Sequence, residues 1–382
     1  MKKSACLLCL SFLLIHCGPK QDKVERYIED GVEVVVNHLE PYKISGRSIL
    51  TLERILAIDT EDDETAALGL PDIFGFEVNS TGEIYILRNI QGDGDFVFKF
   101  DSNGKFIKSF GPQGQGPGEF QNPRHIAIDS KDNILIYDLG PQILHRYDKD
   151  GVLMGDYRMS GDEARITSGP NENMLAAVHT SESDKGRTLN THFLKLLNPD
   201  LEVLKVIDEF SFEWRRDKAR VTEPLLCWSV SRDHIYVANE ARGYEIWVHD
   251  SNGKLIRKIQ KEFTQIPVSE DFKNKTMEQF PEGMREQMSK MVYFPEFHPP
   301  IQNLVAGDDG LLLVSTFEEG EKPEEFMFDI INEEDVFIGR KSLKIWIWEA
   351  HLWAKIKANK LYCLEVKGSG FRELVVYNMI WE

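Results

Sequence analysis

The chain has 382 residues, of which 42% are hydrophobic and 28% charged, and its formal net charge is −18. This composition is typical of a folded soluble protein and excludes collagen-like, disordered and polytopic membrane chains. The length favours two domains or one large repeat architecture. Because a strongly acidic surface repels phosphate backbones, we expect no nucleic-acid partner.

The start of the chain predicts an export signal. Two lysines precede an apolar stretch from Ala5 to Ile15 that is too short to span a bilayer. The sequence Leu-Ile-His-Cys17 then resembles a bacterial lipobox, in which the cysteine becomes the lipidated first residue of the mature protein, although its histidine stands where a small residue is usual. We therefore expect a signal peptide over residues 1–16, lipidation at Cys17 and a lipoprotein of the cell envelope, in the outer membrane and facing the periplasm or the cell surface. An ordinary secretion signal is the alternative.

We expect residues 17–47 to form an anchor or linker with a short hairpin. Beyond this segment the chain has two cysteines. Cys227 and Cys363 both lie in apolar, strand-like runs. We expect buried free thiols that pack as small hydrophobic groups. A disulfide between them is the alternative in an exported protein, and no Cys/His cluster predicts a metal site.

A recurring strand–turn–strand motif indicates the fold. An apolar strand ends at Asp or Asn, a short polar turn follows, and another apolar strand begins; the side chain starts the turn and a glycine often supplies the positive φ. The six copies have their polar residue at Asp101, Asp148, Asn198, Asp250, Asn332 and Asn378. The first four copies recur about every 50 residues, which is the period of a propeller blade.

Hairpin-like pairs of apolar strands precede these turns, as in Gly75–Ile86 and Ile126–Ile136. Each unit then holds about four short strands at roughly 10-residue spacing. The third unit departs from the pattern, because Ser168–Asn173 replaces its usual turn. We predict an all-β fold, a six-bladed β-propeller over residues 48–382.

The two ends of this region predict how the ring closes. The sixth unit stops where its fourth, outer strand would begin, and residues 48–58 form a strand-like run before the first complete unit. Pairing this N-terminal strand with the last blade would seal the ring and cover an exposed edge.

Residues 264–300, before the fifth blade, predict a helical insertion. Ser269 can cap a first helix, and a second helical run carries Met284, Met288 and Met291 on one apolar stripe. Such a stripe usually packs on the body of the protein. A lid over a ligand opening and a docking face are the alternatives.

The glycine-rich run from Phe110 to Pro123, with the unit that follows it, looks like an NHL-type repeat. Over residues 30–382 the chain resembles bacterial six-bladed β-propeller lipoproteins. The resemblance implies an exported, membrane-anchored propeller and implies little about activity. Related propellers include lactonases, peptide-processing lyases and recognition modules, and the enzymes among them hold divalent metals with acids, Asn or His from several inner strands.

Three residues are candidates for ligand binding. Arg124 and His125 precede an innermost strand, at a junction that tends to face the axial opening, where they could hold a carboxylate or act as acid and base. Trp228 lies near the corresponding strand of the fourth unit and could stack on a ligand. Hydrogen bonding between blades and a core tryptophan are the structural alternatives.

No compact catalytic motif is present, so we assign no catalytic residue, metal or cofactor. We expect a binding module whose axial face takes a small molecule, glycan, peptide or protein. One alternative is a metal-dependent lactonase- or lyase-like enzyme at the central channel. Another is a structural subunit of an envelope complex.

Overall fold

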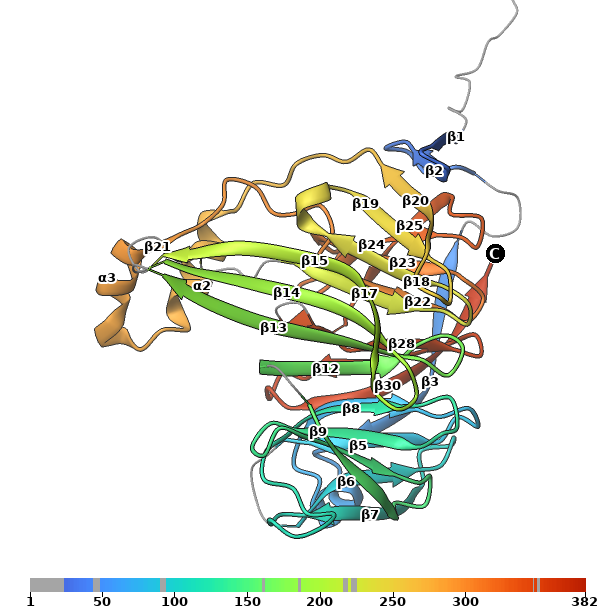
Figure 1. The fold of residues 1–382 in the computed structure, drawn as a ribbon, viewed down its shortest axis with the longest axis vertical. Helices are drawn as coiled ribbons and strands as arrows, with labels where there is room; N and C mark the ends of the chain where they lie inside the picture. Colours follow the sequence, from blue (N-terminus) through green and yellow to red (C-terminus); the bar gives the residue numbers. More distant parts are fainter. Residues whose placement is uncertain are drawn as a thin grey trace, which may run out of the picture.

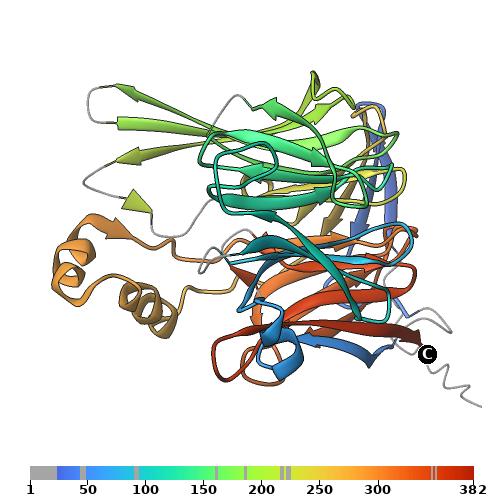
Figure 2. The ribbon, with the colours of Figure 1, turned by 90° about the horizontal axis from the view of Figure 1, so that it is seen from below.

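The computed structural model describes residues 24–43, 49–89, 94–159, 162–184, 187–215, 219–220, 225–345, 347–348 and 351–382. Antiparallel sheets of four strands are arranged in a ring of six blades, which confirms the predicted β-propeller (Figures 1 and 2). The leader and Cys17 lie outside the described residues.

The first three blades follow the chain in order, each from its innermost to its outermost strand. They are β4 (Ile73–Val78), β5 (Ile84–Arg88), β6 (Asp95–Phe100) and β7 (Phe106–Pro112); β8 (Pro123–Ile128), β9 (Ile134–Asp138), β10 (Ile143–Tyr147) and β11 (Leu153–Arg158); and β12 (Asp162–Ser168), β13 (Met174–Asp184), β14 (Arg187–Leu197) and β15 (Val203–Arg215).

The last three blades repeat this arrangement. They are β17 (Leu226–Val230), β18 (Ile235–Asn239), β19 (Glu245–His249) and β20 (Leu255–Lys261); β22 (Asn303–Ala306), β23 (Leu312–Glu319), β24 (Phe326–Ile331) and β25 (Phe337–Leu343); and β28 (Ala354–Lys357), β29 (Lys360–Val366), β30 (Arg372–Trp381) and β3 (Leu50–Asp59). The short elements α1 (Asp63–Ala67), β26 (Ile347–Trp348) and β27 (His351–Leu352) lie between blades, and the 3-10 turn Glu240–Arg242 connects β18 to β19 within the fourth blade.

The ring closes as predicted, because β3 from the N-terminal side is the outer strand of the last blade. It pairs antiparallel with β30, with Leu50 opposite Trp381 and Asp59 opposite Glu373. Asn378, the sixth copy of the turn residue, lies within β30 opposite Glu53 and forms no turn. The strand that would follow it is supplied by β3.

The other turn residues act as the sequence predicts. The Asp250 carboxylate accepts hydrogen bonds from the backbone N–H groups of Asn252 and Lys254, each at 2.9 Å. Gly253 has a φ of +73°, and a Cβ placed there would lie 2.4 Å from the Cδ1 atom of Ile207 on the outer strand of the preceding blade. A glycine is therefore needed both for the turn and for the approach of two blades.

Hydrophobic clusters fill all six seams between neighbouring blades. Cys227 lies in the seam between the fourth and fifth blades, and Cys363 in the seam between the fifth and sixth. Both cysteines are buried free thiols, as predicted. Since each blade packs against a neighbour on either side, its inner strands are apolar on both faces.

The predicted N-terminal hairpin extends the fourth blade. It consists of β1 (Glu25–Glu29) and β2 (Val32–Asn37), and β2 runs parallel to β20 in a six-stranded sheet. The buried Asn37 side chain donates to the Asp335 carbonyl at 3.0 Å and accepts from the Phe337 N–H at 2.8 Å. The hairpin therefore also contacts the fifth blade.

Two segments project from the face where the innermost strands begin, which we call the lobe face (Figure 2). One is the arm, formed by the outer ends of β13, β14 and β15, which have 11, 11 and 13 residues. The other is the helical insertion, and the two are joined where β16 (Ala219–Arg220) pairs in parallel with β21 (Val292–Tyr293). The sequence did not predict the arm.

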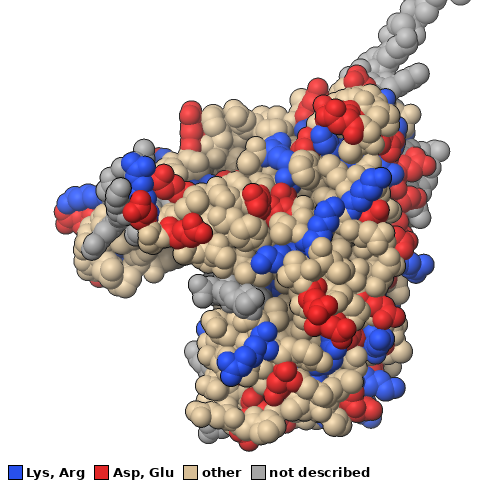
Figure 3. All heavy atoms as spheres, in the orientation of Figure 1, with Lys and Arg blue, Asp and Glu red and all other residues tan. Residues whose placement is uncertain are grey.

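The insertion holds α2 (Glu270–Glu278) and α3 (Glu282–Met291), and Ser269 caps α2 as predicted. No residue of either helix is buried, and the Met284 side chain is 48% exposed. Met288 and Met291 have intermediate exposure, so none of the three methionines of the stripe is fully buried. Within the described part of the chain, no helix combines the length and apolarity needed to cross a bilayer. Acidic and basic side chains alternate over the face shown in Figure 3.

Candidate functional site

A cavity of about 430 Å³ lies on the axis of the ring, and all six innermost strands contribute to its lining. Because these strands run in the same direction, equivalent positions form layers across the axis. The lining residues are Phe76–Val78 and Ser80; His125, Ile126, Ile128–Ser130 and Asp132; Arg165–Gly169; Cys227–Arg232; Asn303–Ala306 and Asp308; and Trp353–Lys357.

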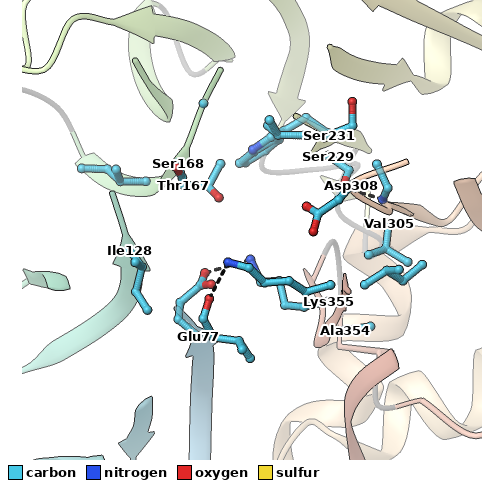
Figure 4. Close-up of a pocket in the computed structure, with 18 of the residues that line it drawn as sticks. Glu77, Ile128, Thr167, Ser168, Ser229, Ser231, Val305, Asp308, Ala354 and Lys355 are labelled. Carbon is cyan, nitrogen blue, oxygen red and sulfur yellow. Dashed lines mark hydrogen bonds and ion pairs between the residues drawn. The ribbon is translucent and has the colours of Figure 1, made fainter. Parts of the chain in front are cut away.

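The middle of the cavity is polar. Lys355 of the sixth blade forms an ion pair with Glu77 of the first at 2.8 Å (Figure 4). Hydroxyl groups of the third and fourth blades face the same space, including Thr167 and Ser229, and the Asp308 side chain points into it (Figure 4). These groups offer donors and acceptors to a ligand from several directions.

The end of the cavity at the lobe face is aromatic and cationic. The Arg165 guanidinium lies over the Trp228 ring at 4.6 Å, which bridges the third and fourth blades. The Trp353 ring covers the backbone of Gly75, where an added Cβ would lie 2.6 Å from it. Gly75 therefore allows the Trp353 ring to approach the first blade closely.

The structure brings two of the three predicted ligand-binding residues into this lining. His125 and Trp228 both line the cavity, and the His125 ring stacks on Tyr137 at 6.4 Å. Arg124 lies outside the lining, with its guanidinium 5.6 Å from the centre of the Phe74 ring.

Two acids at the opposite end of the cavity, Asp129 and Asp132, have structural roles. Asp129 accepts hydrogen bonds from the N–H groups of Lys131 and Asn133, each at 2.9 Å. Asp132 accepts from the Ser80 N–H at 2.8 Å and so ties the second blade to the first. These carboxylates stabilise turns and the contacts between blades. Their presence in the lining is therefore explained without a role in ligand binding.

Two potential nucleophiles of the lining, Cys227 and Ser229, have roles in packing and in linking blades. Among the described residues, no three His, Cys, Asp or Glu side chains come together as a metal-ligating group. Burial raises the pKa of the Cys227 thiol to about 12, so the thiol stays protonated and is a poor nucleophile. The Ser229 hydroxyl accepts the Ala306 N–H at 2.8 Å and links two blades.

Sequence reasoning missed Glu77, Arg165, Asp308, Trp353 and Lys355. A usable signal was present for the ion pair, because Glu77 is the one charged residue of β4 and Lys355 stands between the apolar Ala354 and Ile356 of β28. They occupy the same position of the hairpin unit in neighbouring blades. A charge repeated at such a position predicts a group that faces the axis rather than the seam.

The arm carries a second group of aromatic and imidazole rings near the opening. His179 and His192 face each other across β13 and β14, with ring centres 4.9 Å apart, and His192 stacks on Phe212 at 5.7 Å. Burial, aided by the charges of His179 and Arg165, lowers the pKa of His192 to about 4. His179 lies opposite Asp162 at the start of β12, so this group of rings lies where the arm leaves the ring of blades.

Comparisons with known proteins support the fold. A family model described as a six-bladed β-propeller, DUF5128, matches residues 47–198. No match was found among curated proteins. The chain is similar in structure to a Bacteroides fragilis protein named as a candidate exported protein, with a TM-score of 0.54 and 13% identity over 91% of this chain and 99% of that one.

Two further solved structures match over most of their length with lower scores. A Bacteroides vulgatus member of the DUF4221 family has a TM-score of 0.49 and 12% identity, covering 88% of this chain and 99% of its own. Virginiamycin B lyase from Staphylococcus aureus has a TM-score of 0.38 and 11% identity, covering 87% and 99%. Likenesses at this level of identity concern the fold and leave the activity open.

Proposed function

We propose that this protein is an exported, lipid-anchored binding module that takes a small ligand into the cavity at the axis of its ring. The observation that carries the proposal is a cavity of about 430 Å³ into which several blades direct polar side chains. Its volume falls within the roughly 300–1,000 Å³ of typical ligand sites.

The lining has the mixture that small-molecule recognition requires. Trp228, Trp353 and Phe76 supply apolar surface, while Thr167 and the Glu77–Lys355 pair supply hydrogen-bonding groups. A closed ring holds these groups on rigid strands from six separate blades. Little conformational entropy is then lost on binding, which favours affinity.

The test is ligand-induced thermal stabilisation with a panel of neutral sugars, sugar acids, amino acids and dipeptides. Thr167→Tyr places a bulky side chain in the cavity, and Thr180→Tyr is its matched control on the exposed part of the same blade. We expect at least one compound to raise the unfolding midpoint of the wild type and of the control but not of Thr167→Tyr. If no compound distinguishes the wild type from Thr167→Tyr, the proposal is wrong.

Export and anchoring belong to the same proposal and are supported by the lipobox-like sequence at Cys17. The name of the Bacteroides fragilis neighbour agrees with export. We expect the wild type to partition with membranes and a Cys17→Ala variant to lose this partitioning. Mass spectrometry of the mature N-terminus should find an acylated Cys17, and an unmodified N-terminus at another residue would contradict the anchor.

A further inference from the structure

We propose that the cavity binds an α-amino acid with an apolar side chain at its turn-face mouth, with the ligand ammonium group at Asp308 and the ligand carboxylate at Arg232. The turn face is the side of the ring where the innermost strands end, opposite the lobe face. This inference rests on the proposed function, because it names a class of ligand for the same cavity. It is carried by two available charges on neighbouring blades and by the apolar wall behind them.

The turns that follow the six innermost strands form the mouth. Four lining residues at this end are exposed to solvent, so the cavity opens here. Similar backbone hydrogen bonds close the turns, as from Asp129 to Asn133 at 2.9 Å and from Gly307 to Leu311 at 2.7 Å. In chain order, the first turn residues around the mouth are Ser80, Ser130, Pro170, Arg232, Asp308 and Ala358. Of these six described residues, those of the fourth and fifth blades carry charge.

Asp308 differs from the other acids of the lining. Glu77 is paired with Lys355, and Asp129 and Asp132 accept hydrogen bonds from backbone N–H groups. Within the described part of the chain, the Asp308 side chain forms no ion pair and no hydrogen bond, and its carboxylate points into the cavity (Figure 4). The mouth therefore offers an available carboxylate to a cationic ligand group.

Arg232 is the available cation of the same mouth. The Lys355 ammonium is held by Glu77, and the Lys357 ammonium donates to the Val78 carbonyl at 3.1 Å. The exposed Arg232 guanidinium has neither an ion pair nor a hydrogen bond with any described residue. It can therefore direct two parallel N–H donors to the carboxylate of a ligand.

The strands that carry the two charges lie side by side. The Ser229 hydroxyl accepts a hydrogen bond from the Ala306 N–H at 2.8 Å, which joins the fourth and fifth blades immediately before the two turns. Arg232 follows Ser229 by three residues and Asp308 follows Ala306 by two. The two side chains nevertheless form no ion pair with each other. An α-amino acid carries its ammonium and carboxylate groups on one carbon, so one molecule can contact both charges at once.

The wall behind the mouth is apolar. Ile128, Val230 and Ile356 line the cavity directly before their turns, and Ile128 and Ile356 are buried. Val305 lines the cavity one position deeper (Figure 4). A ligand held at the mouth would direct its side chain toward this wall, where burial of apolar surface favours an aliphatic side chain.

The experiment measures binding to the mature full-length protein by isothermal titration calorimetry. The ligands are L-leucine, L-isoleucine, L-valine and L-methionine. The tightest of the four is then compared with its two analogues that each lack one charged group; for L-leucine these are 3-methylbutylamine and 4-methylpentanoate. We expect the amino acid to bind at least about tenfold more tightly than either analogue, because each analogue loses one of the two charged contacts.

Two variants test the assignment of each charge. Asp308→Asn and Arg232→Gln should each reduce the affinity for the amino acid about tenfold or more. Asp233→Asn, at an exposed position beside Arg232 but outside the lining, is the control for the acid. Arg158→Gln, at an exposed position of the outer strand β11, is the control for the cation. Neither control should change the affinity, and a circular dichroism melt of each variant shows whether it is folded.

The outcomes separate this inference from the proposed function. The amino-acid assignment is overturned if none of the four amino acids binds, if an analogue binds as tightly as its amino acid, or if either Asp308→Asn or Arg232→Gln keeps the wild-type affinity. The proposed function is decided separately by the wider panel and the Thr167→Tyr variant. A sugar whose binding is lost in Thr167→Tyr and kept in Asp308→Asn would support the ligand cavity and contradict the amino-acid assignment.

Discussion

Gly253 shows how one residue joins two blades of the ring. The position requires a positive φ of +73°, and the space where a Cβ would stand is filled by Ile207 of the preceding blade. We expect Gly253→Ala to lower the free energy of unfolding by about 2–4 kcal/mol, since the left-handed backbone costs about 1–2 kcal/mol and overpacking adds a similar amount. Urea denaturation measures the loss.

Gly31 is the matched control for this prediction. Its φ is +80°, but no atom lies within 4 Å of its would-be Cβ. Gly31→Ala should therefore cost only the backbone part, about 1 kcal/mol. Equal losses in the two variants would show that the approach of Ile207 to Gly253 contributes nothing to stability.

His249 links stability to pH. It lies on β19 with 3% of its surface exposed, and burial lowers its pKa from 6.5 to about 4. Between these values the unfolded chain binds a proton that the folded protein does not, so stability is complete above pH 6.5 and falls as the pH drops towards 4. At about 1.4 kcal/mol per pH unit, this group contributes a loss of up to about 3 kcal/mol.

The measurement compares unfolding free energies at several pH values for the wild type and His249→Gln. The variant should be less sensitive to pH between 6.5 and 4, whatever its stability at neutral pH. Identical pH dependence in the two proteins would mean that His249 takes up a proton without unfolding.

The sequence predicted where the axial opening lies better than it predicted which chemical groups line it. The predicted junction before an innermost strand is part of strand β8 itself, where His125 lines the cavity and Arg124 does not. Arg165 could not be found in this way, because the third unit departs from the consensus turn that aligns the others. The stacking of Arg165 on Trp228 joins residues from two blades, which periodicity within one blade does not reveal.

The helical insertion is an element with few anchors. Phe272 of α2 meets the His298 ring edge-on at 4.7 Å, and His298 stacks on Phe317 of the fifth blade at 4.4 Å. We expect Phe272→Ala to free both helices locally, with increased hydrogen exchange over residues 270–291 and little change in the global unfolding midpoint. Met284→Ala, at a 48% exposed position, should leave exchange unchanged. Increased exchange throughout the ring of Phe272→Ala would show instead that the insertion supports the whole fold.

The arm shows why some elements escape prediction. Its strands β13 and β14 leave the ring beyond Val178 and His192, where the hydrophobic clusters end and polar residues occupy both faces. A strand without a buried face lacks the alternation that marks a strand in sequence. The turns of the ring were predictable because Asp and Gly are required there, whereas the tip of the arm imposes no such residue.

The whole molecule depends on closure of the ring. Each blade packs on two neighbours through the six apolar seams, and β3 completes the last blade by pairing with β30. An open ring would expose the strand edge of β30 and one face of a seam to water, which is costly in both hydrogen bonds and apolar area. We therefore infer that the blades unfold together.

Ile58 tests this cooperativity. It lies on β3, is 3% exposed and belongs to the seam between the sixth and first blades. Ile58→Asp buries an unpaired charge there and should cost about 3–5 kcal/mol. Because closure is shared by the ring, hydrogen exchange should speed up even in β9 and β18, which lie in other blades. Val206→Asp, at a 42% exposed position on the outer strand β15, should have little effect. Faster exchange confined to the sixth and first blades would show that blades unfold separately, and the ring would then behave as a chain of semi-independent units.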